Sequence, residues 1–198
     1  MTPVVLASKS ASRAAILAGA GVAFDTLGPG VDEGEAKTRL LAAGAGPKEI
    51  AAHLAEAKAK AVSAIRPEAL VIGADQTLDL GGALRDKAES PAEARERLVE
   101  LRGREHHLHS AVVVARGGSA IWRTLESPRL RMRAFSDAFL DRYLARNGQA
   151  VLGSVGCYML EGEGAQLFER MEGDYFAILG LPLLPLLAFL RGEGALMA

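Results

Sequence analysis

The start of the chain constrains the fold most strongly. Residues 4–7 form an apolar run, which changes abruptly into a segment containing Ser8, Ser10, Ser12 and Arg13. The apolar run predicts a short buried strand, and the apolar spacing over residues 10–18 predicts a helix directly after it. A strand followed by a helix is the unit whose repetition indicates an α/β structure. The turn also offers backbone N–H groups, hydroxyls and a fixed positive charge, which together suit phosphate. The alternative is an ordinary helix start with Ser10 as the N-cap, which requires no ligand.

The rest of the chain continues this alternation of strands and helices. Strands are expected at 24–27, 69–74, 107–116 and 120–132, with a hairpin arm at 77–80, and helices at 47–65, from 90 onward, at 136–146 and at 183–190. Pro47 suits the first turn of its helix, while Ser90 and Ser136 suit N-caps. The pattern predicts an α/β fold, and residues 1–198 are long enough for one domain with a sizeable core.

Composition excludes several classes of function. The net charge of −1 provides no general attraction for nucleic acid, so any affinity for phosphate must be local. The single cysteine, Cys157, cannot form an internal disulfide and is expected to be a small buried hydrophobe. The N-terminus lacks a signal-peptide pattern, and the C-terminal apolar run is too short to span a bilayer. We therefore expect a soluble cytoplasmic protein with no membrane partner.

Asp75 is the strongest candidate for chemistry. It follows the apolar run at 69–74, and we expect it at the carboxyl end of that strand. Ligands of open α/β sheets bind at that edge, and an aspartate there can hold Mg²⁺ or orient a water molecule for attack on phosphorus. The alternative is that Asp75 only marks the point where the strand meets water.

Four further charged residues are weaker candidates. In the helix at 47–65, Lys58 lies nearer the apolar stripe than Lys60, so Lys58 is better placed to reach a cleft. Its side chain could equally extend along the edge of the core. Lys87 and Glu33 fall in segments expected to be loops, where a solvent-exposed side chain is the default. Glu161 lies in a glycine-rich acidic loop that allows the backbone to approach a ligand closely.

Two other patterns do not indicate a functional site. His106, His107 and His109 are close in sequence, but on a strand only His107 and His109 share a face, and no third ligand has zinc-like spacing. We expect this segment to be a solvent-facing strand edge. The common phosphate-loop and dinucleotide-binding motifs are absent from the sequence.

Taken together and in order, these segments resemble the Maf family of nucleoside triphosphate pyrophosphatases almost end to end. The matching segments are 6–13 (LASKSASR), 32–33 (DE), 55–59 (AEAKA), 73–76 (GADQ), Lys87, 101–104 (LRGR), 161–162 (EG) and 180–183 (GLPL). Each motif is short and weakly specific alone, whereas eight motifs in the correct order are specific.

The resemblance implies a fold and an activity. The family fold is an elongated mixed sheet flanked by helices, with two lobes around a central cleft, as in inosine triphosphate pyrophosphatases, and the protein is often a homodimer. The reaction is hydrolysis between the α and β phosphates with Mg²⁺ or a related divalent ion such as Mn²⁺. By position, Asp75 matches the catalytic acid. The other matches are Ser8, Arg13, Lys58 and Lys87 around the triphosphate, and Glu33 as an acidic residue of the cleft that can join Asp75 at the metal.

Base preference depends on three further matched positions, Ser12, Gln76 and Glu161. Gln76 with Glu161 is similar to the subgroup that favours 7-methyl-GTP, and the positive charge of N7-methylguanine suits a carboxylate. Ser12 departs from the bulkier residue usual there, and Ala11 and Ala88 replace prolines. The alternatives are a house-cleaning pyrophosphatase for dTTP, UTP or ITP, and a nucleotide-binding regulator of septum formation with little turnover.

Overall fold

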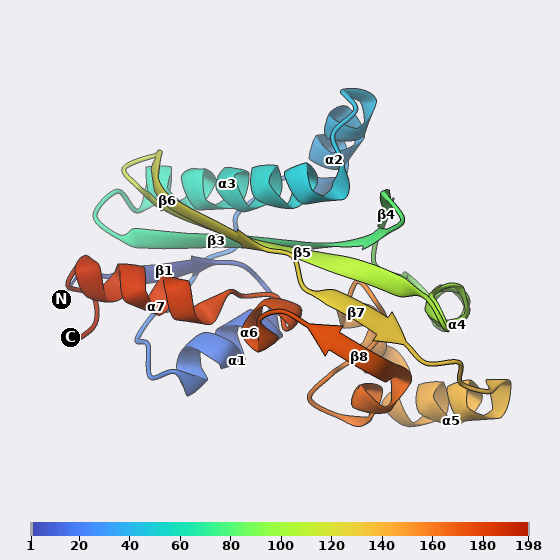
Figure 1. Ribbon diagram of the computed structural model, residues 1–198. Helices are drawn as coiled ribbons and strands as arrows, with labels where there is room; N and C mark the ends of the chain where they lie inside the picture. Colours follow the sequence, from blue (N-terminus) through green and yellow to red (C-terminus); the bar gives the residue numbers. More distant parts are fainter. Residues whose placement is uncertain (1, 198) are drawn as a thin grey trace.

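A computed structural model describes residues 2–197 and shows a mixed eight-stranded sheet flanked by helices (Figure 1). The strands are β1 (Val4–Ala7), β2 (Asp25–Thr26), β3 (Leu70–Leu80), β4 (Ala83–Arg85), β5 (Glu105–Arg116), β6 (Ser119–Glu126), β7 (Arg129–Met132) and β8 (Phe168–Glu172). Their order is β2-β1-β3-β5-β7-β8, with β4 paired to β3 and β6 paired to β5. Strand β1 pairs in parallel with β2 and with β3, and the other strand pairs of this sheet within residues 2–197 are antiparallel. The predicted α/β fold with a mixed sheet is confirmed.

The helices lie on both faces and at one end of this sheet. They are α1 (Ala11–Gly19), α2 (Glu33–Ala42), α3 (Pro47–Ile65), α4 (Pro91–Leu101), α5 (Asp137–Asn147), α6 (Tyr175–Ile178) and α7 (Leu183–Gly192), with short 3₁₀ helices at Gly148–Gly153 and Glu163–Leu167. In Figure 1, α3 covers one face of β3 and β5, while α1 and α7 lie on the other. No helix within residues 2–197 is long and apolar enough to cross a membrane.

The long strands β3 and β5 join the two ends of the molecule. One apolar core forms between the sheet and helices α1 and α7, and another forms where α4 and α5 pack around the far ends of β5 and β7. Helix α3 packs very closely on β3. A Cβ on Gly73 would lie 2.2 Å from the carbonyl oxygen of Ala55, so only glycine permits this approach.

Several sequence-based expectations about the strands were wrong. The expected strand and hairpin arm form one continuous strand, β3 (Leu70–Leu80), so Asp75 lies in mid-strand and not at its end. The expected strand at 120–132 is two strands separated at Ser127 and Pro128, because β5 pairs with β6 along one half of its length and with β7 along the other. Helix α2 and strand β8 were not expected at all.

The histidines also differ from expectation, because β5 has neighbours on both sides and is not an edge. His106 is 1% exposed, and its Nε2 lies 2.9 Å from the Tyr158 hydroxyl. His109 is also buried, with Nδ1 2.8 Å from Ser127 Oγ and Nε2 3.2 Å from Asp79 Oδ2. These two side chains therefore link β5 to Tyr158, to the turn between β6 and β7, and to β3.

His106 makes stability depend on pH. Burial lowers the pKa of His106 to about 4, with a smaller contribution from His107. In the unfolded chain the imidazole takes up its proton near pH 6.5, whereas in the folded protein it does so only near pH 4. The free energy of unfolding is therefore highest above pH 6.5 and decreases as the pH falls toward 4. We expect the free energy of unfolding to drop by about 3 kcal/mol over this range from His106 alone.

Urea unfolding at pH 7, 5.5 and 4 measures this effect. The His106→Phe variant should lose that part of the pH dependence, while His53→Gln, at an exposed site on α3, should retain it. An unchanged pH dependence in His106→Phe would exclude His106 as its source.

Candidate active site

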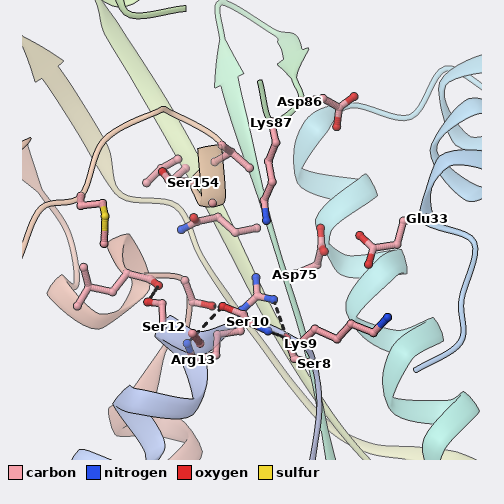
Figure 2. Close-up of a pocket in the computed structure, with 18 of the residues that line it drawn as sticks. Ser8, Lys9, Ser10, Ser12, Arg13, Glu33, Asp75, Asp86, Lys87 and Ser154 are labelled. Atoms are coloured by element: carbon pink, nitrogen blue, oxygen red, sulfur yellow. Dashed lines mark hydrogen bonds between the residues drawn. The ribbon is translucent and has the colours of Figure 1, made fainter. Parts of the chain in front are cut away.

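A cleft of about 900 Å³ brings together every residue selected from the sequence. Its walls come from the β1–α1 turn, α2, α3, mid-β3, the loop after β4 and the segments around residues 150–161 and 178–180. Figure 2 shows this cleft with Asp75 and Glu33 near each other and Lys87 reaching toward them from the loop after β4. The predicted site residues lining it are Ser8, Ser12, Arg13, Glu33, Lys58, Asp75, Gln76, Lys87 and Glu161.

The β1–α1 turn holds Arg13 in a fixed position. Ser10 is the N-cap of α1 and accepts a hydrogen bond from the Arg13 backbone N–H. Ser8, buried at the end of β1, accepts from the Ser10 N–H at 3.2 Å and from Arg13 Nη1 at 3.4 Å, and Arg13 Nε donates to the Gly180 carbonyl at 3.0 Å. Ser10 therefore has the ordinary capping role, while Ser8 supports a guanidinium that lines the cleft.

Burial lowers the pKa of Arg13 from its ordinary value, and the negative charges of Asp75 and Glu33 oppose this shift. Arg13 as a whole is partly exposed and lines the cleft, and its guanidinium stays charged because arginine is not deprotonated in proteins. A cation in the first turn of a helix opposes the helix dipole, so these carboxylates compensate for an unfavourable position.

Asp75 reaches the cleft because β3 extends beyond its parallel neighbour. Strand β1 pairs with β3 only as far as Gly73, and the next side chain on that face is Asp75. Asp75 is 6% exposed, and its Oδ1 lies 2.7 Å from Lys58 Nζ. The expected position at a strand end was thus incorrect for β3 itself, while β1 does end beside this site.

Lys58 lies between two carboxylates. Its Nζ is 2.7 Å from Asp75 Oδ1 and 2.9 Å from Glu33 Oε1, and the whole residue is 4% exposed. Lys60 is exposed and pairs with Glu56 on the same helix. The helical geometry inferred from the sequence therefore distinguished these two lysines correctly.

Glu33 and Lys87 come from segments that sequence reasoning treated as loops. Glu33 is instead the first residue of α2, after Asp32, whose side chain caps that helix by accepting from the Glu35 N–H. Lys87 does lie in a loop, and an ion pair between Lys37 and Asp86 connects that loop to α2. Partial burial and the positive charge of Arg13 lower the pKa of Lys87. A bound anion would offset the repulsion between Lys87 and Arg13.

The three positions associated with base choice also lie at this cleft. Ser12 Oγ donates to the Leu179 carbonyl at 3.2 Å. Gln76 is half-buried and donates from Nε2 to groups on β5 and α6. Glu161 is exposed at the cleft wall and makes no side-chain hydrogen bond or ion pair within residues 2–197. The sequence did not predict that Ser110 and the carbonyls of α6 contact Gln76, because no local motif marks these groups.

The donor set is compatible with a hard divalent cation. Within residues 2–197 no group of three His, Cys, Asp or Glu side chains forms a metal cluster. Mg²⁺, however, is commonly held by one or two carboxylates together with substrate phosphates and water. Asp75 and Glu33, whose oxygens converge on one Lys58 nitrogen, are residues that could supply those carboxylates.

Comparisons with known proteins identify similar chains. The family model described as Maf-like protein matches residues 3–193. A nucleoside triphosphate pyrophosphatase of Caulobacter vibrioides is 63% identical over 196 residues, covering 99% of this chain and 98% of that protein. One from Granulibacter bethesdensis is 52% identical, and a 7-methyl-GTP pyrophosphatase of Rhizobium meliloti is 49% identical, each covering 98% of both chains.

The contrast between Lys58 and Lys60 leads to a binding prediction. Lys58→Gln removes a buried cation from the cleft, and charge-assisted hydrogen bonds contribute about 1.5–3 kcal/mol. We expect inorganic pyrophosphate to bind at least about tenfold more weakly to this variant, as measured by calorimetry. Lys60→Gln, two residues along α3 and on its exposed face, should bind pyrophosphate normally. Equal affinities for the two variants, both checked for folding by circular dichroism, would contradict this role for Lys58.

Proposed function

The chain belongs to the Maf family, and we propose that it is a nucleoside triphosphate pyrophosphatase. The observation that supports this most is the position of Asp75, a buried acid surrounded by Lys58, Arg13 and Lys87 in one cleft. Cations bind the phosphates of a nucleotide, whereas an aspartate among them would repel those phosphates unless it has a chemical role. The relatives named nucleoside triphosphate pyrophosphatase support the same assignment.

In the proposed mechanism, water attacks the α-phosphorus and the bond from that phosphorus to the bridging oxygen breaks. The products are a nucleoside monophosphate and pyrophosphate. Asp75 orients the water and accepts its proton, while Lys58, Lys87 and Arg13 neutralise charge that develops on the phosphates and on the leaving pyrophosphate. Ser8 keeps the Arg13 guanidinium in place.

We propose Mg²⁺ or Mn²⁺ as the cofactor, with Asp75 and Glu33 as its protein ligands. Such an ion supplies charge neutralisation at the phosphates and lowers the pKa of a bound water. Lys58, which bridges these carboxylates here, would then turn its positive charge toward the phosphates. As in many family members, the active protein would be a homodimer.

The proposed preferred substrate is 7-methyl-GTP. Gln76 and Glu161 both line the cleft, and Glu161 lacks a cationic partner within residues 2–197, so its carboxylate is available to a positively charged base. The Rhizobium meliloti relative carries the name 7-methyl-GTP pyrophosphatase. The alternatives within the same enzyme class are dTTP, UTP and ITP. A binding regulator of septum formation is less well supported, because binding alone does not require Asp75.

Asp75→Asn tests the enzyme class. The amide has the same shape but cannot accept the proton, so we expect turnover to fall by about 10²–10⁴-fold with the fold intact. Pyrophosphate release should be measured with 7-methyl-GTP, GTP, dTTP, UTP, CTP and ITP, each with Mg²⁺ and with Mn²⁺. Asp79→Asn is the matched control, since Asp79 lies on the same face of β3 but outside the cleft lining. Undiminished turnover in Asp75→Asn would refute the mechanism.

Glu161→Gln tests the base preference. Loss of the carboxylate should reduce kcat/KM for 7-methyl-GTP by about tenfold while changing the value for GTP much less, because only the methylated base carries a positive charge. The same nucleotide panel provides the measurement. If the ranking of the nucleotides stays unaltered, Glu161 has no part in choosing the base.

A further inference from the structure

The amide of Gln76 is held in one orientation. Its Nε2 shares its two hydrogens among three acceptors: Ser110 Oγ at 2.8 Å, the Ala177 carbonyl at 3.0 Å and the Ile178 carbonyl at 3.1 Å. Backbone carbonyls only accept hydrogen bonds, so the amide nitrogen must be the atom that faces α6. The opposite orientation would place the amide oxygen against two other oxygens.

The other end of the amide, Oε1, is directed toward the cleft. No group within residues 2–197 donates a hydrogen bond to Oε1, and this atom is not among the fully buried polar atoms that lack a partner. A Cβ placed on Gly180 would lie 3.7 Å from Gln76 Oε1 and 3.7 Å from Arg13 Nε. Gly180 lines the cleft, and because it has no side chain, the oxygen remains open to a ligand.

Ser110 enforces this orientation from the neighbouring strand. It is the registered partner of Gln76 on β5 and is completely buried. Its Oγ donates to the Ala177 carbonyl at 2.6 Å. A serine hydroxyl has a single proton, so with that proton committed to Ala177 it can only accept from Gln76. Ser110 therefore requires the amide nitrogen, and not the oxygen, on its side.

We propose that Ser110 is a positioning residue for base selection. By fixing the Gln76 amide, Ser110 leaves Oε1 free to accept a hydrogen bond from a base that has an N–H donor on its pairing edge. Guanine presents N1–H and N2–H₂ on that edge. This inference rests on the proposed function, since it assigns the base recognition within the same cleft.

Substrate analogues test the acceptor in the unmodified protein. A donor removed from the base leaves Oε1 unpaired or in contact with a methyl group, which disfavours binding. We expect kcat/KM for 1-methyl-GTP, which lacks N1–H, or for ITP, which lacks the N2 amine, to be at least about tenfold lower than for GTP. If both analogues match GTP, Gln76 Oε1 does not read a donor and the proposal fails.

Variants at Ser110 test the positioning role. In Ser110→Ala the amide keeps only its two carbonyl acceptors on α6, so it is restrained less firmly, and the discrimination between GTP and the poorer analogue should fall about threefold or more. Ser110→Thr keeps the hydroxyl and should restore discrimination. Binding of inorganic pyrophosphate, which has no base, should stay unchanged in both. A uniform loss for all nucleotides with unchanged ratios would show a merely structural role and overturn the proposal.

Two further measurements distinguish a failure of this inference from misfolding of Ser110→Ala and from a failure of the proposed function. If Ser110→Ala does not fold, Ser110→Cys replaces it, because a thiol keeps the approximate size but is a weak hydrogen-bonding group. Unchanged discrimination in Ser110→Cys would then overturn the proposal. If the unmodified protein releases pyrophosphate from no nucleotide, the proposed function fails. Calorimetric affinities for GTP, 1-methyl-GTP and ITP, measured for the unmodified protein and the Ser110 variants, would then decide this inference alone.

Discussion

The contact between Lys58 and Asp75 organises the cleft. Both residues are almost fully buried, and their charged atoms are 2.7 Å apart. Removing water from two charges is costly, and a buried pair adds little stability over an apolar pair of similar size, while removing one partner costs about 3–5 kcal/mol. The pair is therefore better explained by its proposed role in the reaction than by a contribution to folding stability. Glu33, more open to solvent, adds a second carboxylate to the same lysine nitrogen.

The backbone makes this contact possible in two ways. Gly73 allows α3 to lie directly on β3, which brings Lys58 within reach of Asp75. Strand β1 ends opposite Gly73 and β4 pairs with β3 only from Leu78 onward, so the residues of β3 between them have no strand on that side, and Asp75 and Gln76 line the cleft. Close packing and an unequal length of adjacent strands together create a site in the middle of a strand.

Two successive residues on β3 have different proposed roles. Asp75 faces α3 and the cationic side chains, whereas Gln76 faces the opposite side and bonds to Ser110 and α6. Alternation of side chains along a strand therefore separates the proposed phosphate chemistry from the proposed base recognition by one residue. Because both residues are on one rigid strand, their spacing does not depend on a mobile loop.

The sequence by itself determined the local features: the strand–turn–helix at the start, the Ser10 cap, the alternation that gives an α/β fold, and the face of α3 that carries Lys58. These follow from interactions within a few residues, which periodicity and capping express. Only the tertiary structure decided that Asp75 lies in mid-strand, that His106 and His109 are buried, and that Gln76 meets α6 about a hundred residues later. Those outcomes depend on which strands become neighbours, and that is set by burial over the whole chain and leaves no local pattern.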